Sequence, residues 1–247
     1  MIKLIRFGAA GPARSADAFE AAWRREARRA AEAPPDARPA RVTVATVLAG
    51  LSGPAERPGS GTSHDVVSFL WFPDAECLAR FEAWQAATGA TAAGATATGV
   101  TAAGLVASSV VARERVARGA DWLAAHAASG GGAFKHIALS RRADGLTRAE
   151  FSRLWAEHGG VVQTSGASAV IPEAARGQAY VQNHPDPTGD EPAYDAVNEV
   201  YFADLAGLRG RVSWFQQNPP TGGLFGRSEY LAVREVVVAS AATVDVS

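Results

Sequence analysis

The 247-residue sequence predicts an α+β fold in which two modules of the same βαββαβ order follow one another. Three observations support this fold class. Short segments recur in both halves, each half shows the same succession of strand and helix patterns, and the composition is globular, with 47% hydrophobic and 20% charged residues. The order βαββαβ is that of the ferredoxin-like motif, a four-stranded antiparallel sheet with both helices on one face.

The repetition keeps a nearly constant spacing along the chain. The segment 2–5 (IKLI) recurs 132 positions later as 134–137 (FKHI), and the segment 65–74 recurs 130 positions later as 195–204. Between and after these segments, matching residues keep the same order. Ser15, Phe19 and Trp23 correspond to Thr147, Phe151 and Trp155. Leu78 and Trp84 correspond to Leu208 and Trp214, and Arg113-Glu114 corresponds to Arg234-Glu235. Aligned blocks in one order indicate an internal duplication.

The first helix of each half is predicted from its N-terminal signal and its apolar spacing. In the second half, Thr147 and Glu150 form a capping-box pattern, and Phe151, Trp155, His158 and Val162 follow at helical spacing. The corresponding helix of the first half begins at Ser15 and carries Phe19 and Trp23. Strands are expected at 41–49, 65–72, 105–115, 177–184, 195–202 and 230–239, besides the strands that open each half, and second helices at 74–86 and 204–216.

The expected domain organisation is a first module at 1–116, a linker at 117–132 and a second module at 133–247. Each four-stranded sheet would leave one apolar face uncovered, so the two sheets should bury these faces against each other as an intramolecular pseudo-dimer with a shared barrel. Whether two chains associate further as a homodimer is left open. Residues 86–104, rich in Ala, Gly and Thr, are expected to form a loop without a functional role. The loop 215–229 is equally compatible with a lid over a pocket or with a loop of this kind.

Composition excludes several classes of function. The formal net charge of −1 gives no field for nucleic acid, and no apolar run is long enough for a membrane span. The single cysteine, Cys77, excludes an intrachain disulfide and fits a cytoplasmic protein. Zinc-ligand spacings, a nucleotide-binding glycine motif and a nucleophile elbow around Ser165 are all missing. The expected partner is therefore a small-molecule substrate, and no metal or other cofactor is expected.

Three segments of the second half resemble the EthD-like family of the dimeric α+β barrel superfamily. They are the helix 146–158 with Phe151, Trp155 and His158, the strand 180–184 (YVQNH), and the strand 194–202 (YDAVNEVYF). The first half matches only in outline, since Glu26 stands in the place of His158. This resemblance implies that the two modules form an intramolecular dimeric α+β barrel. It also implies small organic substrates, often polyketide-like aromatics, and cyclisation, dehydration, decarboxylation or cofactor-free oxygenation.

Two histidines are the candidate catalytic residues. His158 lies on the inward stripe of its helix, where a partly desolvated imidazole could act as acid or base. His136 replaces Leu4 of the first half and would share a cavity with His158 if its strand face looks toward the helices. For each histidine, the alternative is a buried side chain that hydrogen-bonds a carbonyl group.

The second strand of the second module provides candidate substrate-binding residues. Tyr180, Gln182 and His184 alternate onto one strand face and could orient substrate oxygen atoms. Asn198 and Glu199 are adjacent in a strand, so they face opposite sides and cannot both serve one site; for Glu199, pairing with an arginine is the favoured interpretation. Trp155 is expected to pack in the core and to form a pocket wall.

These residues predict a cofactor-independent enzyme that acts on a small aromatic or polyketide-like metabolite by acid/base chemistry, in the manner of a cyclase, dehydratase, isomerase or decarboxylase. A cofactor-free monooxygenase of an activated phenol or anthrone is the alternative enzyme. A non-catalytic metabolite-binding protein belongs to a different class, and His158→Ala would separate it from an enzyme. Haem binding through His158 ranks lowest. The first half should be scaffold with a closed cavity, so one ligand is expected per chain.

Overall fold

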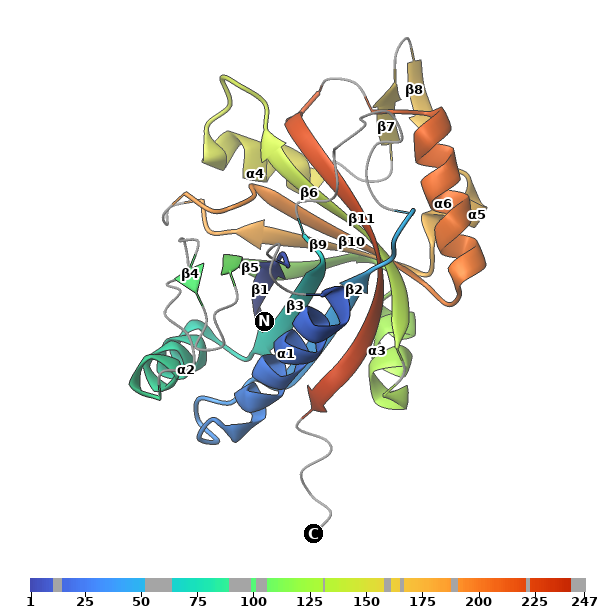
Figure 1. Cartoon of the computed structure of the whole chain (residues 1–247). Coiled ribbons are helices and arrows are strands. Elements are labelled where there is room, and N and C mark those ends of the chain that lie inside the picture. The colour runs from blue at the N-terminus through green and yellow to red at the C-terminus, as the bar shows by residue number, and fades with distance from the viewer. Residues whose placement is uncertain are drawn as a thin grey trace.

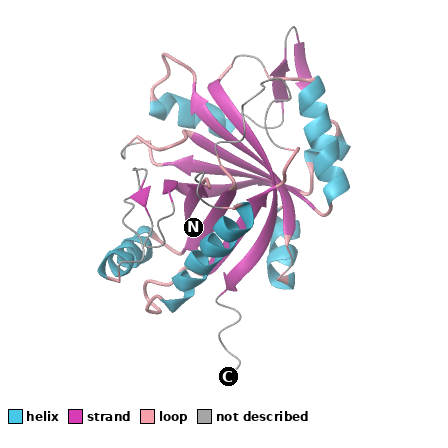
Figure 2. Ribbon diagram, viewed as in Figure 1, coloured by secondary structure: helices cyan, strands magenta, loops and turns pink. Residues whose placement is uncertain are grey.

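Eight strands close into one antiparallel barrel, with six helices around it, in the part of the chain that the computed structural model describes (Figures 1 and 2). The described residues are 1–10, 15–51, 64–88, 99–100, 106–130, 132–157, 161–164, 167–187, 191–220 and 223–240. The barrel strands are β1 (Ile2–Gly8), β2 (Arg41–Val47), β3 (Val66–Phe72), β5 (Val106–Arg118), β6 (Ala133–Arg142), β9 (Ala179–Pro185), β10 (Ala196–Phe202) and β11 (Phe225–Ser240).

Around the barrel the strand order is β1-β3-β2-β11-β6-β10-β9-β5, and β5 pairs back onto β1. Three shorter strands are additional to this barrel. The two-residue β4 (Gly99–Val100) pairs with β5, and β7 (Val161–Thr164) pairs with β8 (Ala167–Val170) in a separate two-stranded sheet.

The predicted fold class, two ferredoxin-like modules that pair as an intramolecular dimeric α+β barrel, is wrong and is corrected to this single closed antiparallel β-barrel of eight strands. The finding that overturns the prediction is the hydrogen bonding between the halves. Strand β2 pairs with β11, and β5, which pairs with β1 of its own half, also pairs with β9. Closure of this kind leaves the barrel without an edge strand between the halves. The periodicity of a sequence gives strand positions but not these long-range partners.

Helices lie outside the barrel, as Figure 1 shows. Three of them begin with side-chain caps. The Ser15 hydroxyl accepts a hydrogen bond from Ala18 N, and the Asp74 and Asp204 carboxylates accept from Cys77 N and Gly207 N. The helices are α1 (Ala16–Arg29), followed by a 3₁₀ turn (Ala30–Glu32), α2 (Ala75–Ala87), α3 (Ala120–Ser129), α4 (Arg148–Glu157), α5 (Glu173–Arg176) and α6 (Leu205–Gln217).

The capping box of α4 is confirmed by its hydrogen bonds. Glu150 N donates to the Thr147 hydroxyl over 3.2 Å, and Thr147 N donates to a Glu150 carboxylate oxygen over 2.9 Å. This reciprocal arrangement satisfies two backbone amides at the start of the helix. The Thr147 hydroxyl, and after it the Thr147 backbone N–H, donate to the carboxylate and lower the pKa of Glu150. Each of the described helices is too short or too polar to cross a lipid bilayer.

The expected loop 215–229 is largely regular structure. Helix α6 continues to Gln217, and β11 begins at Phe225, so the described part of the connection spans only 218–220 and 223–224. A lid of the predicted length is therefore not present in the described residues. The loop expected at 86–104 falls mostly outside the described residues. The linker contains a helix, α3, which is bracketed by Gly119 and Gly130 in left-handed conformations.

Candidate functional site

A polar group of side chains lies on the outer face of the barrel in the second half. Strands β9, β10, β6 and β11 are neighbours there, and directly opposed residues share one face of a sheet. Asn198 lies opposite both Gln182 and Ala138, and Ala138 lies opposite Tyr230. Two residues further along β10, on the same face, His136 and Tyr180 both lie opposite Val200. We call the following set the polar belt: His136, Tyr180, Gln182, Asn198, Arg211 and Tyr230.

Apolar clusters flank the polar belt on two sides. Under α4, Phe151 and Trp155 pack on Ala196, and under α6, Leu208 and Val212 pack with Val200. Figure 1 shows α4 and α6 on either side of the strands that carry the belt. The belt is therefore a strip of hydrogen-bonding groups between two apolar walls, which is the usual composition of a small-molecule site.

His136 is the imidazole of the belt, and 4% of its surface is exposed. Its Nδ1 accepts a hydrogen bond from Nε of Arg211 over 3.1 Å. Burial, together with the positive charge of Arg211, holds the pKa of His136 well below its ordinary value, so the ring is neutral at pH 7. Because Nδ1 is the acceptor, the ring proton resides on Nε2, and His136 can donate a hydrogen bond but is a poor base.

Aromatic rings enclose His136. The Tyr230 ring stacks on the imidazole at a centroid distance of 5.4 Å, with an interplanar angle of 10°, and the Phe215 ring lies 5.5 Å away. The centroid of the Phe215 ring also lies 4.6 Å from the Arg211 guanidinium carbon. Planar walls of this kind favour a flat, aromatic ligand.

Tyr180, Gln182 and Asn198 form a hydrogen-bonded chain along the belt. The Tyr180 hydroxyl donates to Asn198 Oδ1 over 2.9 Å and lies 3.3 Å from the donor Gln182 Nε2. Gln182, which is fully buried, also donates to the Trp155 carbonyl and accepts from Arg115 Nη1 over 2.6 Å. Burial raises the pKa of Tyr180, so its phenol stays protonated as a donor.

His184 lies at the α4 end of the belt. Its ring packs on Trp155 at a centroid distance of 4.1 Å, and Nε2 lies 3.4 Å from Gln182 Oε1. Burial, with a smaller contribution from Arg115, lowers the pKa of His184 to about 4. His184 is therefore a neutral, weakly basic imidazole at pH 7. Arg115 comes from β5, so the first half supplies a residue to this end of the site.

The structure brings six of the eight predicted site residues to one outer face: His136, Tyr180, Gln182, His184, Trp155 and Asn198. His158 lies outside the described residues, so its role stays a prediction. Glu199 points into the barrel, away from the belt. Its carboxylate accepts from Lys3 Nζ and from Lys135 Nζ, each over 2.6 Å, so its partners are lysines rather than the expected arginine.

The interior end of the barrel around Glu199 is an ionic cluster rather than a binding site. Glu199 is fully buried, and burial alone would raise the pKa of its carboxyl group, but Lys135 and Lys3 override that effect and lower it. Lys3 also pairs with Glu114, and Lys135 with Glu235. Each buried lysine thus has two carboxylate partners. Arg41 also pairs with Glu235, so three cations face three carboxylates.

Arg211 and Tyr230 are belt residues that the sequence analysis did not identify. A signal for Arg211 was present, because the 130-residue spacing aligns it with Phe81 and it follows Leu208 on the buried side of its helix. A charged residue at an inward helical position next to apolar ones is the kind of exception that marks a functional site. Tyr230 carries no comparable signal.

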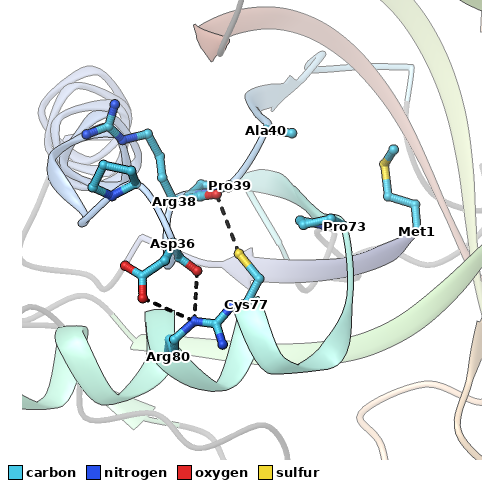
Figure 3. A pocket seen from close by; sticks show the side chains of 9 residues that line it. Met1, Asp36, Arg38, Pro39, Ala40, Pro73, Cys77 and Arg80 are labelled. Atoms are coloured by element: carbon cyan, nitrogen blue, oxygen red, sulfur yellow. Dashed lines mark hydrogen bonds and ion pairs between the residues drawn. The ribbon is translucent and has the colours of Figure 1, made fainter.

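A hollow of about 450 Å³ lies in the first half, beside the start of α2 (Figure 3). Its polar groups bond to one another: Arg80 Nε donates to the Asp36 carbonyl over 2.9 Å, and the Cys77 thiol contacts the Arg38 carbonyl at 3.7 Å. Burial raises the pKa of Cys77, which keeps the thiol protonated. This hollow therefore presents neither a nucleophile nor an acid/base pair.

The chain matches no known protein family by its sequence, and no curated protein is similar to it. One similar solved structure is described as "Crystal structure study of anthrone oxidase-like protein". The two chains share 11% sequence identity with a TM-score of 0.43, over 97% of this chain and 95% of the other. A likeness this distant carries no inference about activity.

Proposed function

We propose that this protein is a cofactor-independent enzyme that binds a small aromatic or polyketide-like metabolite at the polar belt and transfers protons on it. The reaction is of the cyclase, dehydratase, isomerase or decarboxylase type. The observation that carries the proposal is the neutral His136, whose Nδ1 accepts from Arg211 so that Nε2–H is available as a donor. Membership of the EthD-like family rests on three sequence segments and belongs to the same proposal.

The belt supplies groups that stabilise an oxygen atom as it gains negative charge. Nε2–H of His136 and the Arg211 guanidinium are donors fixed by their own hydrogen bonds, and they are directed at different oxygen atoms of a ligand. Donors that are already oriented stabilise an enolate or phenolate without reorganisation during the reaction. Loss of a proton from a carbon next to a carbonyl group, or from a phenol, produces such an oxygen. The base that removes this proton is assigned to His158.

Anthrone tests the proposal directly, because loss of a proton from its ring methylene turns its carbonyl oxygen into a phenolate-type oxygen. The exchange of these methylene protons in D₂O, without oxygen, is followed by proton NMR. We expect the wild-type protein to accelerate exchange. His136→Phe should reduce the acceleration by about 10²-fold, the usual effect of removing one such donor. His126→Phe, which changes a histidine of α3 outside the belt, is the matched control and should behave as wild type.

The same experiment separates the other functions. Oxygen consumption when air is admitted would indicate the cofactor-free monooxygenase. Binding of anthrone, seen by quenching of tryptophan fluorescence, without any accelerated exchange would indicate a metabolite-binding protein. Exchange that is equally fast in the wild type and in His136→Phe would contradict the role of the belt.

A further inference from the structure

We propose that the polar belt holds its ligand as a single-oxygen anion, a phenolate or an enolate, and that Arg211 is the counter-charge for this anion. This inference rests on the proposed function for the location of the site. It goes further by naming the charge state of the ligand and the residue that selects it.

Arg211 is a buried cation with neutral partners. Its side chain belongs to a residue that is 8% exposed, in the middle of α6. Nε donates to His136 Nδ1, and Nη1 donates to the Ala175 carbonyl over 2.8 Å. No carboxylate of a described residue forms an ion pair with this guanidinium. Burial lowers the pKa of Arg211 to about 10, which still leaves it charged at pH 7.

Other buried cations of this chain have carboxylates close by. Lys3 and Lys135 pair with Glu199 inside the barrel. Arg6, on the outer face of the first half, has the negative charges of Glu26 and Glu82 in its surroundings, and they oppose the effect of burial on its pKa. A buried charge without a counter-charge is costly. Arg211 therefore differs from these other buried cations, and an anionic ligand would supply its counter-charge.

The groups that face Arg211 supply no negative charge of their own. They are His136 on β6, Tyr180 on β9, Tyr230 on β11, Arg118 on β5 and the Ala175 carbonyl on α5. His136 is neutral, and burial raises the pKa of both tyrosines, so their phenols remain protonated. The field at this point of the belt is thus positive before any ligand binds.

The donors that remain favour one oxygen atom over a carboxylate. A carboxylate binds best to two parallel N–H groups of a guanidinium. In Arg211, Nε and Nη1 already donate to His136 and Ala175, which leaves Nη2 without an acceptor among the described residues. Nη2 can donate to a single oxygen, whereas the Nε2–H of His136 lies on the side of the ring that faces away from the guanidinium. The Tyr230 ring, which stacks on the imidazole, and the tilted Phe215 ring suit an oxygen attached to an aromatic ring.

The test uses 4-nitrophenol, whose ionisation changes its visible absorption, and 4-nitroanisole, its methyl ether, which cannot ionise. Absorption of bound 4-nitrophenol is recorded against pH. We expect the wild type to bind the phenolate about tenfold more tightly than the phenol, which lowers the apparent pKa of the bound probe by about one unit. This preference should be lost in Arg211→Met, and binding of 4-nitroanisole should be unchanged. The exposed Arg209→Met, on the same helix, is the matched control.

Arg211→Lys keeps the positive charge and serves if Arg211→Met does not fold; it should retain part of the phenolate preference. Wild-type protein that binds 4-nitrophenol with an unchanged or raised apparent pKa, or that binds neither probe, would overturn the inference. Accelerated exchange of anthrone without phenolate preference would overturn this inference and leave the proposed function standing. Phenolate preference without exchange would support the anion site and contradict the enzyme.

Discussion

The outer faces of the two halves carry opposite kinds of side chain at corresponding positions. Leu4, Val44 and Phe81 of the first half are buried together in one apolar cluster. The aligned positions of the second half are His136, Gln182 and Arg211, which belong to the polar belt. The registers agree, since Leu4 lies opposite Leu70 as His136 lies opposite Val200, and Val44 lies opposite Ser68 as Gln182 lies opposite Asn198.

This difference indicates that the first half of the barrel is organised for apolar packing and the second half for polar contacts. Apolar side chains fill the space between strands and helices in the first half and gain stability from burial. The second half places hydrogen-bonding groups and a buried charge in the same space, which costs stability. Sites that sacrifice stability in this way are commonly functional.

The largest expected effect on stability comes from the packed half. Phe81 is fully buried in the apolar cluster, against Phe72 at a ring-centroid distance of 5.2 Å. Phe81→Ala should lower the free energy of unfolding by about 3–5 kcal/mol, as measured by urea denaturation, because it leaves a cavity. The exposed Glu76→Ala on the same helix should change this free energy by less than about 0.5 kcal/mol. At urea concentrations below the unfolding transition, the Phe81→Ala variant should still accelerate proton exchange on anthrone. Loss of this acceleration in the folded variant would contradict the distinction between the two halves.

A smaller effect of opposite sign is expected when the polar half is given the residues of the packed half. The double variant His136→Leu and Arg211→Phe removes a buried charge together with its hydrogen-bond partner. Replacement of a buried polar cluster by apolar residues is often neutral or stabilises by about 1–4 kcal/mol. We therefore expect an unchanged or higher melting temperature, together with loss of 4-nitrophenol binding. A large destabilisation would show that the belt contributes to the stability of the fold.

The smallest effect concerns His184, which lies at the position of Thr46 in the first half. The folded-state pKa of His184 is about 4, below the value of about 6.5 for a free histidine. A depressed pKa means that the unfolded chain takes up the proton first, so this contribution to stability is full above pH 6.5 and is lost as the pH falls toward 4. His184→Gln should flatten this part of the stability–pH curve. NMR titration of the wild-type His184 ring with a midpoint near 6.5 would contradict the assignment.

Much of the local structure could be predicted from the sequence, but less of the candidate site could be. The strand at 179–185 and its polar face followed from the alternation of Tyr180, Gln182 and His184. His136 was identified because an imidazole replaces Leu4. Arg211 was missed although it stands at the position of Phe81 on the buried side of its helix. Its partner His136 lies 75 positions earlier in the chain, so no local pattern links the two residues.

The sequence by itself determined where the main helices and strands lie, because caps, apolar spacing and alternation act over a few residues. Thr147 and Glu150 illustrate this, since their hydrogen bonds are the ones their spacing predicts. Only the tertiary structure decided how the barrel closes, through the pairings of β2 with β11 and of β5 with β9. The tertiary structure also decided which polar side chains contact one another and which of them carry a charge. Both depend on burial and on contacts between distant segments, because a buried group takes its pKa and its partners from whatever the fold places around it.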